Sequence, residues 1–259
     1  MGLLLLGEPE QANDVYTTSE SPLNELRRQD DTHMTSRDLL DARLRLAVEN
    51  RKDIRILQIG ACDGRRFDPV YRFISTHPAV SGVFIEPISE YFRQLVDTYK
   101  SLPGATFLNF AVSDFNGFSD IRYVDPQAIA DGVIPAWAVG ISTMEHRKNA
   151  IDGIMIDPAV YGSIAPHVKS VSVPVVRLQD LLHMPFCATA NVYLSDCEGH
   201  DFTLFSALKE TEFRPDIFFL ESMLMSAEEL SSVKETLFDW DYIVHVDKAD
   251  LVAWKRPRS

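Results

Sequence analysis

Acidic side chains that follow strand-like segments are the residues of this sequence best suited to proton-transfer chemistry. Asp196 ends the run 191–196, and Glu198 and His200 come shortly after it. A carboxylate or an imidazole can take the proton of a neutral hydroxyl, so we predict Asp196 as the catalytic base and His200 as the second candidate. Glu198 is a third candidate, with a role as a helix N-terminal acid weighed equally, whereas for His200 a surface position is favoured over catalysis.

The same region offers a metal site. Glu221 ends a second strand-like run, 216–221, and we expect the two strands to be neighbours in one sheet. Asp196 and Glu221, together with Ser222 or water, could then hold Mg²⁺ and lower the pKa of a substrate hydroxyl. The sequence has no dedicated metal-ligand spacing, so a site without metal is favoured over one with Mg²⁺.

A glycine turn followed by an acid is typical of folds that bind nucleotides. The turn Gly60-Ala61-Cys62-Asp63-Gly64 follows a strand-like run, and Glu86 ends the next run about 20 residues further on, the spacing of an acid that binds ribose hydroxyls. Glycine allows the backbone to approach a ligand, and the helix expected beyond the turn favours a carboxylate or a phosphate. The two features together favour an adenosine-containing ligand. Because the glycine spacing is tighter than G-x-G-x-x-G and Asp63 would repel a pyrophosphate, a cationic cofactor without phosphate fits better.

Regular elements alternate in the first half of the chain and predict how these residues are positioned. Strand-like runs at 54–59, 82–86 and 106–110 alternate with amphipathic helical patterns. This alternation predicts a doubly wound α/β domain with a mostly parallel sheet, in which ligands bind at the carboxyl ends of the strands. We expect one domain over 35–259, preceded by a polar N-terminal arm over 1–34.

Local signals predict further elements. Thr35 with Asp38 and Ser226 with Glu229 are capping pairs that predict helix starts. Two strand-like runs within 242–254 flank a short turn and predict an antiparallel pair that closes the sheet.

Residues 115–190 form a less regular insert with scattered glycine and proline. Two strand-like pieces stand out, 120–124 and 171–178, and Pro174 in the second predicts an edge position or a bulge. A long irregular insert beside a regular core is typical of a lid or a substrate wall.

The composition argues against several classes of function. The chain has 259 residues, of which 46% are hydrophobic, as in a packed globular protein. Its net charge of −13 makes nucleic acid an unfavourable partner. Cys62, Cys187 and Cys197 show no metal-like pairing, and no apolar run is long enough for a membrane span, so we expect a cytoplasmic protein without a membrane partner. The sequence leaves the oligomeric state open, a homodimer included.

Six segments resemble the FkbM-type methyltransferases in order and spacing. The most specific is the block from Asp196 to Asp201. The resemblance covers about residues 54–221 and implies a class I methyltransferase (Rossmann-like) sheet with an antiparallel last strand, S-adenosylmethionine as the cofactor, and methylation of a hydroxyl. The segments are ILQIGACDG (56–64), FIEP (84–87), NFAVSD (109–114), VRLQDLL (176–182), YLSDCEGHD (193–201) and PDIFFLE (215–221).

The resemblance also implies roles for single residues. The turn from Gly60 to Gly64, with Ala61 and Asp63, would hold the methionine part, and Glu86 the ribose diol. The other cofactor-binding positions that it implies are Pro87 beside Glu86, Asn109 and Ala111 flanking the adenine, and Ser142 in a serine motif that precedes the substrate region.

Two positions depart from the family pattern. Gln58 stands where the family usually has Asp, which replaces an ion pair with the cofactor's ammonium by a neutral hydrogen bond, and His200 replaces a small residue. The sequence therefore predicts an S-adenosylmethionine-dependent O-methyltransferase that acts on a hydroxyl of a small molecule, a sugar or a natural product. An NAD-dependent oxidoreductase and a non-catalytic module that binds an adenosyl ligand are the alternatives.

Overall fold

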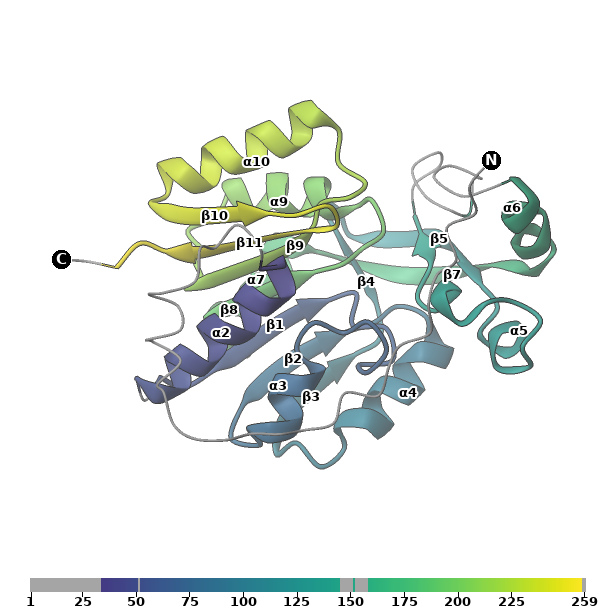
Figure 1. The fold of residues 1–259 in the computed structure, drawn as a ribbon, viewed down its shortest axis with the longest axis horizontal. Helices are drawn as coiled ribbons and strands as arrows, with labels where there is room; N and C mark the ends of the chain where they lie inside the picture. The colour runs from purple at the N-terminus through teal and green to yellow at the C-terminus, as the bar shows by residue number, and fades with distance from the viewer. Residues whose placement is uncertain (1–33, 51, 145–150, 152–157, 258–259) are drawn as a thin grey trace.

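Two β-sheets form the core of the molecule, one with seven strands and one with four (Figure 1). The computed structural model describes residues 34–50, 52–144, 151 and 158–257. The polar arm expected over 1–34 lies, apart from Met34, outside the described residues.

The seven-stranded main sheet has the strand order β10-β11-β9-β8-β1-β2-β3. From β1 the chain adds β2 and β3 on one side and then β8 and β9 on the other, so the order reverses between β1 and β8. These five strands pair in parallel, whereas β11 pairs antiparallel with both β9 and β10. The doubly wound, mostly parallel sheet is thereby confirmed, its antiparallel last strand included. The strands are β1 (Arg55–Ile59), β2 (Ser81–Ile85), β3 (Gly104–Leu108), β8 (Val192–Ser195), β9 (Ile217–Glu221), β10 (Tyr242–Val246) and β11 (Asp250–Lys255).

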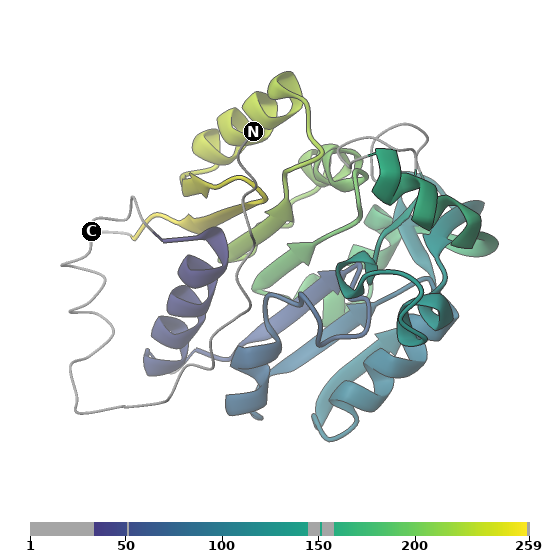
Figure 2. The same ribbon diagram turned by 45° about the vertical axis from the view of Figure 1, so that its right-hand side comes forward.

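Helices cover both faces of the main sheet, because successive strand residues point to opposite faces. Ile56 and Phe84 belong to the apolar core under α2, α3 and α4, whereas Leu57 and Val83 belong to the core under α7, α9 and α10 (Figure 2). The helices are α2 (Ser36–Glu49), α3 (Tyr71–Thr76), α4 (Ser89–Tyr99), α7 (Leu178–Leu182), α8 (Pro185–Ala188), α9 (Asp201–Lys209) and α10 (Ala227–Asp239).

Two of the helix starts follow the predicted capping pairs. The side chain of Thr35 accepts a hydrogen bond from the backbone N–H of Asp38, and Ser226 does the same for Glu229, so both capping boxes are confirmed. The helix expected beyond the glycine turn begins only at Tyr71 and is six residues long. Its N-terminus therefore does not adjoin the turn, and the anion-binding role expected from it is wrong.

The insert is more regular than predicted, because it forms the second sheet, in the order β4-β7-β5-β6. Strand β7 runs over ten residues between β4 and β5, so the edge position expected from Pro174 is wrong for the strand as a whole. Pro174 pairs with Phe118 of β5, but pairing with β4 starts only at Val175, so Pro174 has no partner on the β4 side. A missing N–H is tolerated at such a position. The elements of the insert region are β4 (Ala111–Ser113), β5 (Gly117–Val124), α5 (Pro126–Ala130), β6 (Ser142–Thr143), α6 (Pro158–Ile164) and β7 (Val168–Arg177).

The second sheet has its own apolar core, which includes Ile121 and Val173 and is shared with Ile88 and Tyr91 at the start of α4. This core fixes the insert beside the carboxyl ends of the main-sheet strands (Figure 2). Among the described residues, no helix is both long and apolar enough to cross a lipid bilayer.

Candidate functional site

Two cavities adjoin at the carboxyl ends of β1 and β8, where the strand order of the main sheet reverses. The first cavity, of about 60 Å³, is lined by the ends of β1, β2 and β8 and by residues of the second sheet. The second cavity, of about 240 Å³, is lined by the loop after β1, the ends of β8 and β9 and the turn between β10 and β11. Gly60 and Asp196 line both cavities. This is the place where ligands bind in open parallel sheets.

Gly60 allows the ends of β1 and β8 to approach each other. Its φ is +77°, and a Cβ atom added there would lie 2.0 Å from the backbone oxygen of Asp196. Any other residue would therefore overlap with backbone and would also be strained. The glycine expected from the turn motif is thus required by the approach of a second strand.

Glu86 is buried at the end of β2 and lines the first cavity. Its Oε2 accepts a hydrogen bond from the Cys62 N–H at 2.9 Å, and its Oε1 accepts one from the Ile88 N–H at 2.8 Å. Burial raises the pKa of Glu86 to about 7, with smaller upward contributions from Asp196 and Asp63, against the two hydrogen bonds that lower it. The first cavity therefore contains a fixed carboxyl group that changes charge near neutral pH.

The rest of the first cavity is mostly apolar. Ile59 and Ile85 of the main sheet face Ile121 and Met144 of the insert region across it, and Ser142 adds a hydroxyl. Such a lining suits a flat, largely apolar ring whose edge carries a few polar atoms. The second sheet thus supplies one wall of a cavity that the main sheet alone would leave open.

Gln58 and Asp68 form a polar pair in the second cavity. The Gln58 Nε2 donates to Asp68 Oδ2 at 3.1 Å, and Asp68 Oδ1 accepts from the Val70 N–H at 2.7 Å. Burial raises the pKa of Asp68 to about 6, although these hydrogen bonds oppose the rise. The Oε1 of Gln58 is buried and has no hydrogen-bond partner among the described residues. The pair therefore presents acceptors suited to a cationic group.

Sequence reasoning missed Asp68. The signal was a second acid ten residues after Gln58, at a position where the chain returns from the glycine turn toward β1. Position 58 carries an amide where the resemblance implied a carboxylate, and Asp68 supplies a carboxylate beside it.

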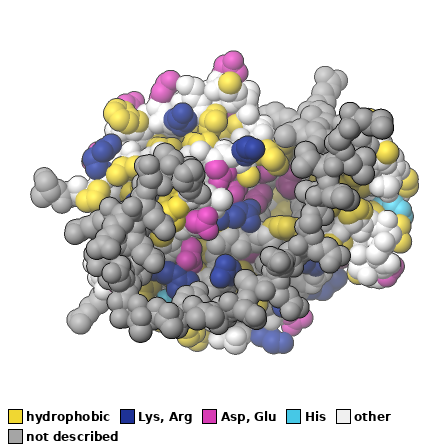
Figure 3. Space-filling view, viewed as in Figure 1, with side chains coloured by type: hydrophobic (Ala, Val, Ile, Leu, Met, Phe, Trp, Pro, Cys, Tyr) yellow, Lys and Arg dark blue, Asp and Glu magenta, His cyan; other side chains and the backbone are white. Residues whose placement is uncertain are grey.

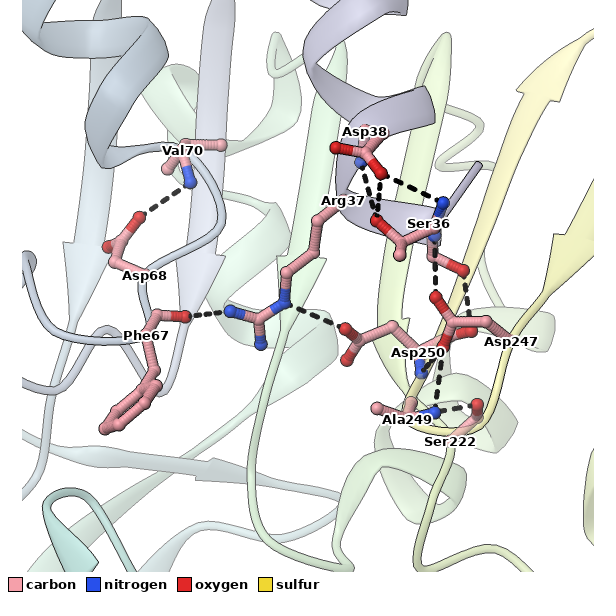
Figure 4. A network of polar contacts seen from close by, with 11 residues as sticks. Ser36, Arg37, Asp38, Phe67, Asp68, Val70, Ser222, Asp247, Ala249 and Asp250 are labelled. Carbon is pink, nitrogen blue, oxygen red and sulfur yellow. Dashed lines mark hydrogen bonds and ion pairs between the residues drawn. The ribbon is translucent and has the colours of Figure 1, made fainter. Parts of the chain in front are cut away.

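Sequence reasoning also missed Arg37, which lines the second cavity from the start of α2. Its Nε donates to Asp250 Oδ2 at 2.9 Å, and its Nη1 donates to the backbone oxygen of Phe67 at 2.5 Å (Figure 4). The neighbouring Ser36 donates from its N–H to Asp247 and from its Oγ to the backbone oxygen of Asp250. The start of α2 is thereby tied both to the turn between β10 and β11 and to the loop that carries Asp68.

Three carboxylates converge on the second cavity. One oxygen each of Asp196, Glu198 and Glu221 lies within 4.8 Å of the other two. Burial raises the pKa of Asp196 to about 7, with further upward contributions from Asp201 and Asp250. Burial also raises the pKa of Glu198 and of Glu221, with repulsion by Asp196 as the next cause for both. Such a group can take up a proton or hold a cation.

The alternative role weighed for Glu198, as a helix N-terminal acid, falls to another residue. Helix α9 begins at Asp201, whose buried carboxylate accepts from the Ser195 Oγ at 2.6 Å and from the Cys197 N–H at 3.0 Å. Glu198 lies before the helix with a φ of +50°. Its side chain lines the second cavity.

His200 is buried, so the surface position favoured for it is wrong. It is 8% exposed, and its Nε2 lies 2.9 Å from the Oγ of Ser113 in β4. It lines the first cavity and not the second. It therefore shares a cavity with Asp196 but not with Glu198 or Glu221.

Most of the other predicted site residues also line one of the two cavities. Three do not, and they shape the surrounding loops instead. The carboxylate of Asp63 accepts from Arg66 Nε at 2.6 Å, a Cβ on Gly64 would meet Leu95, and the Asn109 amide donates to the backbone oxygen of Glu86 at 2.8 Å. The predicted residues that line a cavity are Gln58, Gly60, Ala61, Glu86, Pro87, Ala111, Ser142, Asp196, Glu198, His200 and Glu221.

No family model matches the sequence, and no curated protein matches it either. Among solved structures, the chain is similar to precorrin-6y C5,15-methyltransferase from Geobacter metallireducens, with 12% identity, coverage of 79% of this chain and 81% of that one, and a TM-score of 0.40. It is similar to the N-terminal domain of human METTL16, with 9% identity, coverage of 84% and 68%, and a TM-score of 0.43. It is also similar to the Methanococcus jannaschii fibrillarin pre-rRNA processing protein, with 12% identity, coverage of 80% and 68%, and a TM-score of 0.36. At these identities the similarity concerns the fold alone.

Proposed function

We propose that the protein is an S-adenosylmethionine-dependent O-methyltransferase of the FkbM type that acts on a hydroxyl of a small molecule, a sugar or a natural product. The observation that carries the proposal is the pair of adjoining cavities at the reversal of strand order, one apolar with a buried acid and the other polar and acidic. S-adenosylmethionine consists of an adenosine joined to a cationic amino acid, so it requires an apolar cavity with an acid for the adenosine and, next to it, a polar, acidic cavity for the amino acid.

The adenosine part is assigned to the first cavity. Glu86 lies at the end of β2, where an acid can accept hydrogen bonds from a ribose diol, and its backbone donors leave further lone pairs on both oxygens. Ala111 and Pro87 line the same cavity and leave room for the adenine.

The methionine part is assigned to the second cavity. Its ammonium would donate to Gln58 Oε1 and to the carboxylate of Asp68, which compensates for the neutral residue at position 58. The sulfonium would then lie near Gly60 and Asp196, which line both cavities. The negative charge available there favours a cation over a pyrophosphate, which supports S-adenosylmethionine over NAD.

Methyl transfer is an in-line displacement, in which the acceptor oxygen forms a bond to the methyl carbon while the bond from that carbon to sulfur breaks. The products are the methyl ether and S-adenosylhomocysteine, and the hydroxyl proton has to be removed. We assign this proton to Asp196, whose pKa of about 7 is that of an effective base near neutral pH. The role of this chain is otherwise to align the acceptor and to exclude water.

A small acceptor is favoured over nucleic acid. The net charge is −13, and on the described surface in Figure 3 the basic side chains are interspersed with acidic and hydrophobic ones. A duplex or a single strand requires a continuous basic groove instead. The three free cysteines support a reducing compartment such as the cytoplasm.

The test is calorimetric titration of the full chain with S-adenosylhomocysteine and, separately, with NADH. We expect binding of the first alone, weakened at least about tenfold in Asp68→Asn and in Glu86→Gln, because each loses a charge-assisted hydrogen bond. Glu212→Gln neutralises an exposed acid away from both cavities and is the matched control. Binding of NADH alone would favour the oxidoreductase and overturn the proposal.

The second step is a radiolabelled methyl-transfer assay with a panel of hydroxylated acceptors. Incorporation of label into an ether is the expected result. Binding of S-adenosylhomocysteine without turnover on any acceptor of the panel would instead support a non-catalytic adenosyl-binding module.

A further inference from the structure

The acidic side of the second cavity is built by two neighbouring strands. Asp196 follows β8 and Glu221 ends β9, and the two strands pair in parallel with Ser195 opposite Leu220. Glu198 comes from the loop between β8 and α9. The three side chains thus reach one point from three backbone positions, which are held by the sheet and by the start of a helix.

Glu221 is the buried member of the group, and one of its carboxylate oxygens lacks a hydrogen-bond donor among the described residues. Its side chain belongs to a residue that is 7% exposed, and its Oε2 is buried without a hydrogen-bond partner among the described residues. Other buried acids nearby have partners, since Asp201 accepts from Ser195 and Asp250 accepts from Arg37. Glu221 thus combines a buried oxygen that lacks a donor with a position beside two further carboxylates, and such a group requires a positive ligand or a proton.

The cationic side chains that line the second cavity are engaged elsewhere. Arg37 donates to Asp250 and to the backbone of Phe67, and Arg66 donates to Asp63 and Gln94. Among the described residues, neither guanidinium forms a hydrogen bond or an ion pair with the three carboxylates. Arg37 lowers the pKa of Asp196, but this effect is smaller than the upward effects of burial, Asp201 and Asp250, so the described side chains balance the charge of the group only in part.

The spacing of the oxygens fits an ion. A divalent cation that lies about 2.0–2.6 Å from each ligand oxygen requires oxygens no more than about 5 Å apart. The three oxygens lie within 4.8 Å of one another and face a cavity of about 240 Å³, which has room for the water that completes the coordination of a hard cation. Ser222, the alternative ligand weighed from the sequence, donates its Oγ to the backbone oxygen of Ala249 instead.

We propose that Asp196, Glu198 and Glu221 bind one divalent cation of the Mg²⁺ or Mn²⁺ class at the acceptor side of the cleft. The set consists of carboxylate oxygens alone, which suits hard cations and not Zn²⁺ or Cu²⁺. The role of the ion rests on the proposed function: one oxygen of Asp196 would bind the ion, which would lower the pKa of an acceptor hydroxyl, and the other oxygen of Asp196 would accept the hydroxyl proton. The binding of the ion itself can be measured without a cofactor. Glu198 is then a metal-binding residue.

The test is titration of the metal-free full chain with Mn²⁺, followed by electron paramagnetic resonance, with Mg²⁺ as the competitor. We expect one site that Mg²⁺ competes for, weakened at least about tenfold in Glu221→Gln and in Glu198→Gln, because each variant removes one charged ligand. Glu212→Gln, an exposed acid outside the cavity, is the matched control and should bind as the wild type does. Circular dichroism and S-adenosylhomocysteine binding of each variant identify misfolding, and Glu198, less buried than Glu221, provides the second variant.

Absence of Mn²⁺ uptake by the wild type at millimolar ion would overturn the inference, as would equal uptake by the wild type and both folded variants. If S-adenosylhomocysteine binds and Mn²⁺ does not, the cation site fails while the proposed function stands. If Mn²⁺ binds and S-adenosylhomocysteine does not, the site is supported and its role in methyl transfer is overturned.

Discussion

Replacing Arg37 by alanine tests how the start of α2 is tied to the cleft. The Arg37 side chain is 38% exposed, whereas that of its partner Asp250 is 5% exposed, and the two are joined at 2.9 Å. Arg37→Ala leaves the Asp250 carboxylate buried without its ion-pair partner and also removes the hydrogen bond to Phe67 (Figure 4).

The expected cost follows from the burial of the two partners. Removing one partner of a fully buried pair costs about 3–5 kcal/mol, and an exposed pair contributes about 0–1 kcal/mol. Because Asp250 is buried and Arg37 is partly solvated, we expect a loss of about 2 kcal/mol in the free energy of unfolding near pH 8.

The cost should depend on pH, and its sign is determined by Asp250. Burial raises the pKa of Asp250 even with Arg37 beside it, and loss of Arg37 raises it further. A folded-state pKa above the unfolded value means that stability is highest at low pH and is lost as the pH rises through the folded pKa. The penalty of Arg37→Ala should therefore be larger near pH 8 than near pH 5.

The assay is urea unfolding of the wild type, Arg37→Ala, Asp250→Asn and the double variant at both pH values. We expect a coupling of more than about 1 kcal/mol near pH 8 that shrinks near pH 5. Lys100→Ala is the control: its pair with Asp97 is surface-exposed, with side chains 72% and 79% exposed, so a loss below about 0.5 kcal/mol is expected. A penalty independent of pH, or additive single effects, would refute the reasoning.

Three further outcomes are expected. Gly60→Ala should abolish S-adenosylhomocysteine binding and should destabilise the fold by more than Gly132→Ala does. Both glycines have a positive φ, but only at Gly60 would an added Cβ atom overlap with backbone. Equal losses of stability in urea unfolding would contradict this expectation. The free energy of unfolding of the ligand-free protein should fall from about pH 5 to pH 8. Glu86 should account for about 3 kcal/mol of this fall, because folding raises its pKa from 4.5 to about 7. In urea unfolding, Glu86→Gln should therefore show a smaller dependence of stability on pH. Asp196→Asn should lower kcat for methyl transfer about 100-fold or more while the KM for S-adenosylmethionine changes less, and an unchanged kcat would remove Asp196 as the base.

The main sheet and several of its site residues could be predicted from the sequence, because their signals are local. The strand ends at Gly60, Glu86 and Asp196 are marked by an apolar run that stops at a glycine or an acid, and parallel strands bring such ends to one edge. The capping boxes are equally local, since each lies within four residues.

The parts that could not be predicted depend on contacts between distant residues. Ser36 bonds to Asp247 across 211 positions, and nothing near Arg37 indicates that α2 starts beside the turn between β10 and β11. His200 is buried because β4 brings Ser113 to it across 87 positions. The strand-like runs at 120–124 and 171–178 could be predicted, but their pairing in a second sheet could not, because β5 and β7 are far apart in the sequence and hydrophobic periodicity reports only on nearby residues.

The two ends of the insert lie next to each other, because β4 and β7 pair in parallel from Ala111 opposite Val175 to Ser113 opposite Arg177. The chain therefore leaves the main sheet after β3 through β4 and returns toward it through β7, and these two strands pair with each other. A segment whose entry and exit adjoin can be lengthened, shortened or exchanged without a change in the register of the strands on either side. The wall that the second sheet adds to the first cavity can thus diverge as a module, while the strand ends that carry Gly60 and Asp196 stay as they are.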